Sequence, residues 1–242
     1  MSTSSVIAVV GASGGLGAST LSLAVGRRLA ATGPPALVVD LDIGGGGLDV
    51  TAGIEHLPGR RWPALADVRG QVDAGVLAAS LPGEDGCRVL SAGGPAREVP
   101  SPRAVVDVLA SVVGFGRVVL DVGRAPPPAA AVDPGPLVVL VVRLTTRGLA
   151  DADARLEAVL DACGSAGRPH DVRLVTRGGR PGRDVLDDVV AHLGIAHLCH
   201  LPDDPRVAKD AERGLWPGTG RDAVRRAADA VVALVDEVEV AS

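Results

Sequence analysis

Lysine is almost missing from this sequence of 242 residues, in which Lys209 is the only one. Arginine carries the remaining positive charge, and the formal net charge is −5 at pH 7. A negative chain has no bulk attraction for the phosphate backbone of nucleic acids, so sequence-independent DNA binding is not favoured. A binding site that needs a lysine ammonium group could be built only around Lys209.

Aromatic residues and long apolar runs are also scarce. There is no tyrosine, and Phe115, Trp62 and Trp216 are the only aromatic side chains, so core packing rests on valine, leucine, alanine and isoleucine. The three cysteines are scattered and show neither a disulfide framework nor zinc-ligand spacing, which is typical of a reducing cytosol. No apolar run approaches the roughly 20 residues of a transmembrane helix, and no signal peptide is visible. We therefore expect a cytoplasmic protein.

Strand-like and helix-like segments alternate along the whole chain. The predicted strands cover residues 6–10, 36–41, 88–91, 117–122, 137–142, 172–176 and 195–201. The predicted helices cover residues 19–31, 62–69, 72–79, 103–113, 150–163, 184–193, 206–213 and 221–237. Continuous valine- and leucine-rich strands that alternate with helices predict an α/β fold, with a mostly parallel sheet covered by helices on both faces. Ligands of such sheets bind at the carboxyl ends of the strands.

The first motif at such an end is a phosphate-binding loop without lysine. Residues 6–20 read VIAVVGASGGLGAST, an apolar run, a glycine-rich turn and the small-residue start of a helix. The usual P-loop ends G-K-[ST], whereas Ala18 precedes Ser19 here. The glycines that permit tight backbone turns are Gly11, Gly14, Gly15 and Gly17. The loop can cradle an anion with backbone N–H groups but lacks the side chain that neutralises the β- and γ-phosphates.

Two further motifs place aspartates at strand ends. Asp40 and Asp42 stand at i and i+2 after the second predicted strand, and side chains at that spacing on a strand point the same way. Asp121 closes the apolar run 117–121, the pattern of a Walker B strand whose carboxylate holds Mg²⁺. A solvated acidic turn is the alternative interpretation of the first pair.

Together these motifs resemble the deviant-Walker P-loop ATPases of the ParA/MinD type, whose loop reads K-G-G-x-G-K-[ST]-T. Residues 13–20 match that loop except at its two lysines, and VDLDIGGGGLDVTAG at 39–53 is very close to the MinD switch region. Residues 201–204, Ala211 and Gly214 also fit the family's carboxyl-terminal pattern. The stretches GGGLDVTAGIE and RWPALADVRG further resemble the CpaE/TadZ-like branch, whose actinobacterial members are described as pilus-assembly or septum-site-determining proteins.

The resemblance implies a P-loop NTPase-like fold, ATP and Mg²⁺ as cofactors, and a set of site residues. We expect one domain over residues 1–242, without the receiver-like amino-terminal domain that such relatives often carry. Arg177 stands where relatives often have an asparagine that reads adenine. The residues assigned to nucleotide binding are Gly11, Ser13, Gly14, Gly15, Leu16, Gly17, Ala18, Ser19, Thr20 and Arg177. Ser19, Asp42 and Asp121 are assigned to Mg²⁺, and Asp42 and Asp121 to catalysis.

The departures from the family pattern concern positive charge. Ser13 replaces the signature lysine, which in the family reaches the partner's nucleotide across a dimer, and Ala18 replaces the P-loop lysine. We therefore expect weak or no ATPase activity, because charge stabilisation is most of phosphoryl-transfer catalysis. Arg124 and Arg147 are candidates to substitute for the lysines. A homodimer is an option, and we expect any dimer to depend little on ATP and to use residues 49–55 and 125–136.

The leading functional hypothesis is a scaffold protein with a degenerate nucleotide site. It would position pilus or secretion assembly, or the division septum. Its partners would recruit it to the pole, the septum or the inner membrane face. A working ATP-dependent switch is the alternative, and a DNA-binding segregation protein is a third option that the acidic balance disfavours. We also expect Asp40, Asp42, Asp49 and Asp121 to form an exposed acidic cluster that meets a cation or a basic partner.

Overall fold

One eight-stranded sheet forms the centre of the computed structural model, which describes residues 5–93, 99–123, 137–164 and 171–241. The strand order is β3-β4-β2-β5-β1-β6-β7-β8, and all neighbours are parallel except β3 and β4. The strands are β1 (Ser5–Gly11), β2 (Ala36–Asp40), β3 (Gly83–Glu84), β4 (Cys87–Leu90), β5 (Arg117–Asp121), β6 (Leu137–Arg143), β7 (Val172–Gly178) and β8 (Ala196–Pro202).

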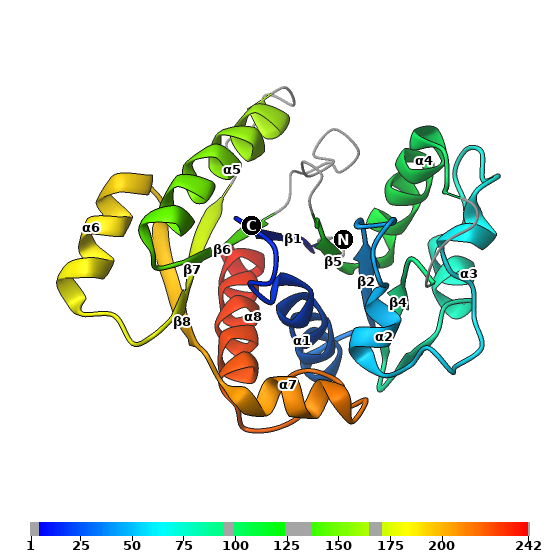
Figure 1. Cartoon of the computed structure of the whole chain (residues 1–242). Coiled ribbons are helices and arrows are strands. Elements are labelled where there is room, and N and C mark those ends of the chain that lie inside the picture. Colours follow the sequence, from blue (N-terminus) through cyan, green and yellow to red (C-terminus); the bar gives the residue numbers. More distant parts are fainter. Residues whose placement is uncertain (1–4, 94–98, 124–136, 165–170, 242) are drawn as a thin grey trace.

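Helices connect the strands and cover both faces of the sheet (Figure 1). They are α1 (Ala18–Thr32), α2 (Leu48–Ala52), α3 (Ala74–Ala79), α4 (Pro102–Val112), α5 (Thr146–Gly164), α6 (Arg183–Leu193), α7 (Pro205–Glu212) and α8 (Ala223–Ala241), with 3₁₀ turns η1 (Trp62–Leu65) and η2 (Val113–Phe115). These connections confirm the predicted α/β fold with a mostly parallel sheet.

Two apolar cores, one on each face, hold the layers together. Because side chains alternate along a strand, Ile7 and Val9 of β1 face the core that contains α1 and α8. Ala8 and Val10 face the opposite core, to which α4, α5 and α6 contribute. The core residues of the central strands β1, β2, β5 and β6 are almost fully buried, which is why these strands read as continuous apolar runs.

All seven predicted strands are present, and the misses are short elements. The helix predicted over 62–69 is only the 3₁₀ turn η1. The indole N–H of Trp62 donates to the Asp40 carbonyl oxygen at 2.6 Å, and the Asp107 carboxylate accepts the Gly70 N–H at 2.9 Å. These tertiary bonds hold the chain in an irregular path. The helix α2 and the two-residue strand β3 were not predicted, because segments of two to five residues carry no usable periodicity.

Candidate functional site

The loop between β1 and α1 has the geometry of a phosphate cradle. Gly15 and Gly17 have φ values of 75° and 82°, which residues with a Cβ rarely adopt, and α1 begins at Ala18 directly after Gly17. A methyl group placed on Gly14 or Gly15 would meet no atom within 4 Å, so this side of the loop is open. The partial positive charge at the amino terminus of α1 therefore faces open space.

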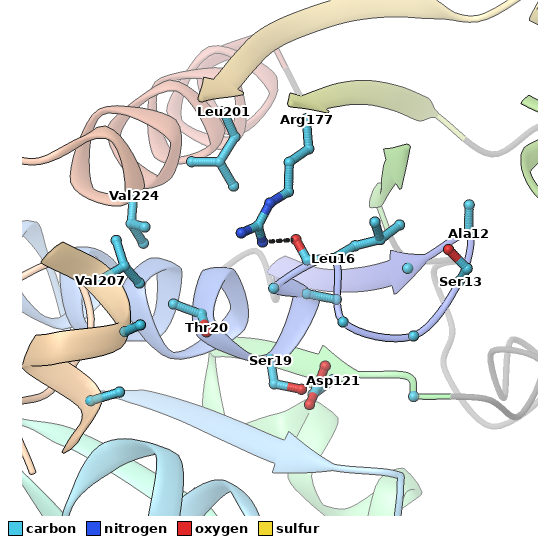
Figure 2. Close-up of a pocket in the computed structure, with 18 of the residues that line it drawn as sticks. Ala12, Ser13, Leu16, Ser19, Thr20, Asp121, Arg177, Leu201, Val207 and Val224 are labelled. Carbon is cyan, nitrogen blue, oxygen red and sulfur yellow. Dashed lines mark hydrogen bonds between the residues drawn. The ribbon is translucent and has the colours of Figure 1, made fainter. Parts of the chain in front are cut away.

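A cavity of about 650 Å³ lies over this loop (Figure 2), a size common among small-molecule sites. The predicted site residues that line it are Gly11, residues 13–20, Asp42, Asp121 and Arg177. The structure therefore brings every residue of the predicted nucleotide and Mg²⁺ sets to one place, although their binding roles stay predictions. Four further lining residues, Leu201, Pro202, Asp204 and Ala211, belong to the carboxyl-terminal pattern noted in the sequence. Lining residues that the sequence did not single out are Ala12, Gly123, Arg155, Val207, Ala208 and Val224.

The cavity has an apolar wall and a polar floor. Leu201, Val207 and Val224 come from β8, α7 and α8, and their side chains lie on one side of the loop (Figure 2). Ser19 and Asp121 lie on the other side, below the start of α1. The arrangement suits a ligand with an apolar ring at one end and phosphate at the other.

Two arginines line the cavity. Arg177, at the end of β7, donates from Nη1 to the Leu16 carbonyl oxygen and from Nε to Asp203 at 3.0 Å. Arg155 of α5 donates to the Gly123 carbonyl oxygen at 2.7 Å, and burial lowers the pKa of its guanidinium. Of the two arginines offered as candidates to replace the lysines, Arg147 is exposed, pairs with Asp151 and does not line the cavity. Arg124 lies outside the described residues.

Asp121 is almost fully buried at the carboxyl end of β5. Burial raises the pKa of its carboxyl to about 6, and nearby Asp42 raises it further, while hydrogen bonds from the Ser19 and Ser22 hydroxyls lower it. The Ser22 hydroxyl donates to Asp121 at 3.2 Å. A hydroxyl and two carboxylates thus stand together, the oxygen donors that Mg²⁺ prefers.

Asp40 does not share this site, which corrects the expectation that Asp40 and Asp42 point the same way. Strand β2 ends at Asp40, so the alternation rule does not extend to Asp42. The buried Asp40 carboxylate accepts the backbone N–H groups of Asp42, Leu48 and Ala92 at 3.0, 3.1 and 3.3 Å. Burial, together with the charge of Asp121, raises the pKa of Asp40 to about 7. Asp40 therefore anchors the loop, and only Asp42 lines the cavity.

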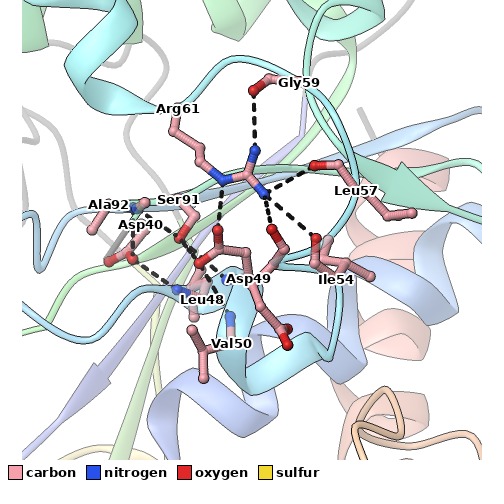
Figure 3. Close-up of polar contacts among 12 residues, drawn as sticks. Asp40, Leu48, Asp49, Val50, Ile54, Leu57, Gly59, Arg61, Ser91 and Ala92 are labelled. Atoms are coloured by element: carbon pink, nitrogen blue, oxygen red, sulfur yellow. Dashed lines mark hydrogen bonds and ion pairs between the residues drawn. The ribbon is translucent and has the colours of Figure 1, made fainter. Parts of the chain in front are cut away.

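Asp49 is also not part of an exposed acidic cluster, contrary to expectation (Figure 3). It is 2% exposed, and its carboxylate accepts hydrogen bonds from Arg61 Nε at 2.6 Å and the Ser91 hydroxyl at 2.7 Å. The Arg61 guanidinium also donates to the carbonyl oxygens of Ile54, Glu55, Leu57 and Gly59 at 3.0–3.4 Å. Asp49 therefore stabilises the packing of this segment. Residues 49–55 expose less surface for a dimer contact than expected.

The titration of Asp121 predicts a pH-dependent stability. Its folded pKa of about 6 lies above the ordinary value of 3.8, so between these pH values the folded state binds more protons than the unfolded state. The resulting stabilisation is present at low pH and is lost as the pH rises through about 6. We expect Asp121 to contribute a loss on the order of 1 kcal/mol between about pH 5 and pH 7.5.

Urea unfolding of the parent and of Asp121→Asn at both pH values, with a chelator present, measures this contribution. The stability difference between variant and parent should shift in favour of the variant at the higher pH. The difference cancels the opposite contribution of His197, whose pKa is lowered by burial. It includes a change at Asp40, whose pKa the Asp121 charge raises, and this change has the same sign. A difference that is the same at both pH values would show that Asp121 does not titrate in this range.

Comparisons with known proteins agree with this geometry at the level of the fold. The structure of MinD in the MinC:MinD cell division complex of Aquifex aeolicus superposes with a TM-score of 0.72, at 19% identity over 96% of both chains. A ParA family ATPase from Chlorobium tepidum gives 0.72 at 15% identity, over 93% of this chain and 97% of the other. This chain has the MinD/ParA-type P-loop fold. The septum site-determining protein MinD of Pyrococcus horikoshii, in complex with Mg-ADP, gives 0.66 at 20% identity over 97% and 96%.

Sequence comparison finds a relative whose role is not described. The uncharacterized protein Rv3660c of Mycobacterium tuberculosis is 36% identical over 216 residues, which cover 86% of this chain and 57% of the relative. The chain thus spans little more than half the length of the curated relatives that it matches. No protein-family model matches the chain. The comparisons therefore establish the fold, and the CpaE/TadZ-like branch stays a proposal.

Proposed function

We propose that the protein is a nucleotide-binding scaffold of the CpaE/TadZ-like branch, which positions pilus or secretion assembly or the division septum and turns over ATP slowly or not at all. The observation that carries the proposal is a complete phosphate cradle with no lysine. The glycines, Ser19, Asp42 and Asp121 line one cavity, whereas Lys209 is exposed and does not line it. A loop shaped like a phosphate site, without the charge that the family uses for hydrolysis, supports binding with little turnover.

The lining residues fit a nucleoside phosphate with Mg²⁺. The backbone of residues 13–19 would hold the phosphates, and the apolar wall of Leu201, Val207 and Val224 would take the base. Ser19, Asp42 and Asp121 would hold Mg²⁺ directly or through water. When bound, the ion supplies positive charge to the phosphates. The ionised form of Asp121 that this role needs prevails above about pH 6.

Slow turnover follows from the two substitutions. At Ser13 and Ala18 the side chains carry no charge, so negative charge that develops on the transferred phosphoryl group meets no lysine. A working switch ATPase is the second candidate, because Arg155 and Arg177 bring two cations to the cavity wall. Among the described lining residues, the carboxylates of Asp42, Asp121 and Asp204 oppose the charge of these two arginines.

The scaffold role is proposed to act through protein contacts. MinD of Aquifex aeolicus forms a complex with MinC, which is the kind of protein partner that this fold can hold. Within the described ranges, no helix combines the length and the apolar character needed to cross a bilayer. We therefore propose that partners bring the protein to its place of action, and the net charge of −5 favours this over direct DNA binding.

Calorimetric titration with ATP, with and without Mg²⁺, and a steady-state ATPase assay test the proposal together. We expect the parent to bind ATP and to hydrolyse it no faster than a Gly15→Glu control. Gly15 faces the open side of the loop at φ 75°, so a glutamate there would place negative charge in the cradle and strain the turn. Robust turnover that Asp42→Ala abolishes would favour the switch ATPase instead.

A further inference from the structure

Arg177 occupies a central place in the cavity, between the apolar wall and the phosphate loop (Figure 2). Its side chain extends from the end of β7 toward the start of α1, across 161 positions of sequence, to reach the Leu16 carbonyl oxygen. The side chain is 23% exposed, so most of its length is packed. Strand β7 fixes the backbone at Arg177, which pairs with Arg143 of β6 and Leu201 of β8.

The guanidinium of Arg177 is anchored at one end and has donors to spare at the other. Its Nε donates to Asp203 at 3.0 Å, and Arg143 also contacts Asp203, at 3.5 Å. Its Nη1 donates to Leu16. A guanidinium has five N–H bonds, and within the described part of the chain no acceptor is found for the other three. Such a group suits the oxygens of a phosphate, because its planar fork can donate to two of them.

Gly17 provides the space that lets Arg177 come this close. A Cβ at Gly17 would collide with Nη1 of Arg177, and the φ of 82° also disfavours any side chain there. The Leu16 carbonyl oxygen points toward the guanidinium (Figure 2). A carbonyl that faced a bound phosphate would repel it, and Arg177 covers this oxygen with positive charge. Arg177 therefore favours anion binding at the loop in two ways: it offers N–H donors, and it offsets the negative end of the Leu16 carbonyl dipole.

We propose that Arg177 supplies the phosphate-binding positive charge that lysine supplies in the usual P-loop, and that its ligand is the phosphate chain of a nucleoside di- or triphosphate. The inference rests on the proposed function, since it assumes a nucleotide in this cavity. It differs from the role of the asparagine that reads adenine in relatives, because the guanidinium donates to the Leu16 carbonyl oxygen of the phosphate loop. Asp203 acts as a positioning residue that holds the Nε side.

Titration calorimetry with ADP and with adenosine tests the assignment, because adenosine carries the base and ribose without phosphate. We expect Arg177→Ala to weaken ADP binding at least about tenfold, the effect of losing a charge-assisted hydrogen bond, and to leave adenosine binding unchanged. Arg143→Ala is the matched control: it removes the other arginine on Asp203, and Arg143 does not line the cavity. That variant should bind ADP nearly as the parent does. Thermal unfolding of each variant confirms that it is folded.

A second variant tests charge replacement directly. Ala18→Lys added to Arg177→Ala should restore most of the lost ADP affinity, because either cation can serve the same phosphates. Equal losses for ADP and adenosine, or ADP affinity in Arg177→Ala that equals or exceeds that of the parent, would overturn the assignment while leaving the proposed function standing. A parent that binds no ADP or ATP would overturn both. Arg155→Ala then shows how much of the charge comes from the other arginine that lines the cavity.

Discussion

Replacement of Arg61 with alanine is expected to lower the free energy of unfolding by about 3–5 kcal/mol. The variant leaves the Asp49 carboxylate, whose side chain is 3% exposed, as a buried charge without its cation (Figure 3). It also removes the donors to four carbonyl oxygens of residues 54–59. For a domain of this size, at about 2–4 °C per kcal/mol, the loss corresponds to a fall in melting temperature of roughly 6–20 °C.

Differential scanning calorimetry of Arg61→Ala and of Arg147→Ala measures the effect against a matched control. Arg147 also pairs with an aspartate, at 2.9 Å, but its side chain is 87% exposed, so its removal should cost no more than about 1 kcal/mol. Similar losses in the two variants would contradict the view that the Arg61 pair holds the segment together.

The same network changes how the acidic residues can be tested. If Asp42 and Asp49 both belonged to an exposed cluster, the double variant Asp42→Asn, Asp49→Asn would leave the fold intact. Because Asp49 is buried against Arg61 and Ser91, that double variant would confound loss of a binding surface with loss of stability. Asp42 lines the cavity, so a substitution of Asp42 by itself can test ligand or partner binding without removing the buried Asp49 contacts.

Ala18→Lys is expected to tighten ATP binding by about tenfold or more. Ala18 is the first residue of α1 and lines the cavity, so a lysine there starts where the usual P-loop lysine does. One charge-assisted hydrogen bond contributes about 1.5–3 kcal/mol, which corresponds to roughly 10- to 100-fold in affinity. Calorimetric titration with ATP and Mg²⁺ gives the affinity directly.

Ala31→Lys is the control for charge alone, because it adds the same group at an exposed position near the other end of α1. It should leave ATP affinity close to that of the parent. Unchanged affinity in Ala18→Lys would mean that the loop does not hold phosphate in the way its glycines indicate. Equal gains in ATP affinity in the two variants would indicate a general effect of the added positive charge rather than a hydrogen bond from residue 18 to the phosphates.

The sequence alone determined the fold class and the position of the cavity. Continuous apolar strands, alternating helices and the glycine loop are local patterns, and they locate the strand ends at which residues 11–20, Asp42 and Asp121 meet. The same patterns indicated that the loop lacks its lysine. These features could be predicted because each depends on residues within one segment of chain.

Only the tertiary structure decided which charges reach the cavity and which are buried elsewhere. Arg155 comes from a segment far along the chain, and nothing near it in sequence marks its place in the cavity beside Gly123. The resemblance assigned Arg177 to nucleotide binding, but only the fold shows its hydrogen bond to the Leu16 carbonyl oxygen. Asp40 and Asp42 have the same local pattern but different fates, because β2 ends between them. Asp49 finds Arg61 and Ser91 only when loops from separate segments pack together. The physical reason is that an arginine side chain is long enough to reach many different acceptors. The packing of helices and strands decides which acceptor lies within its reach.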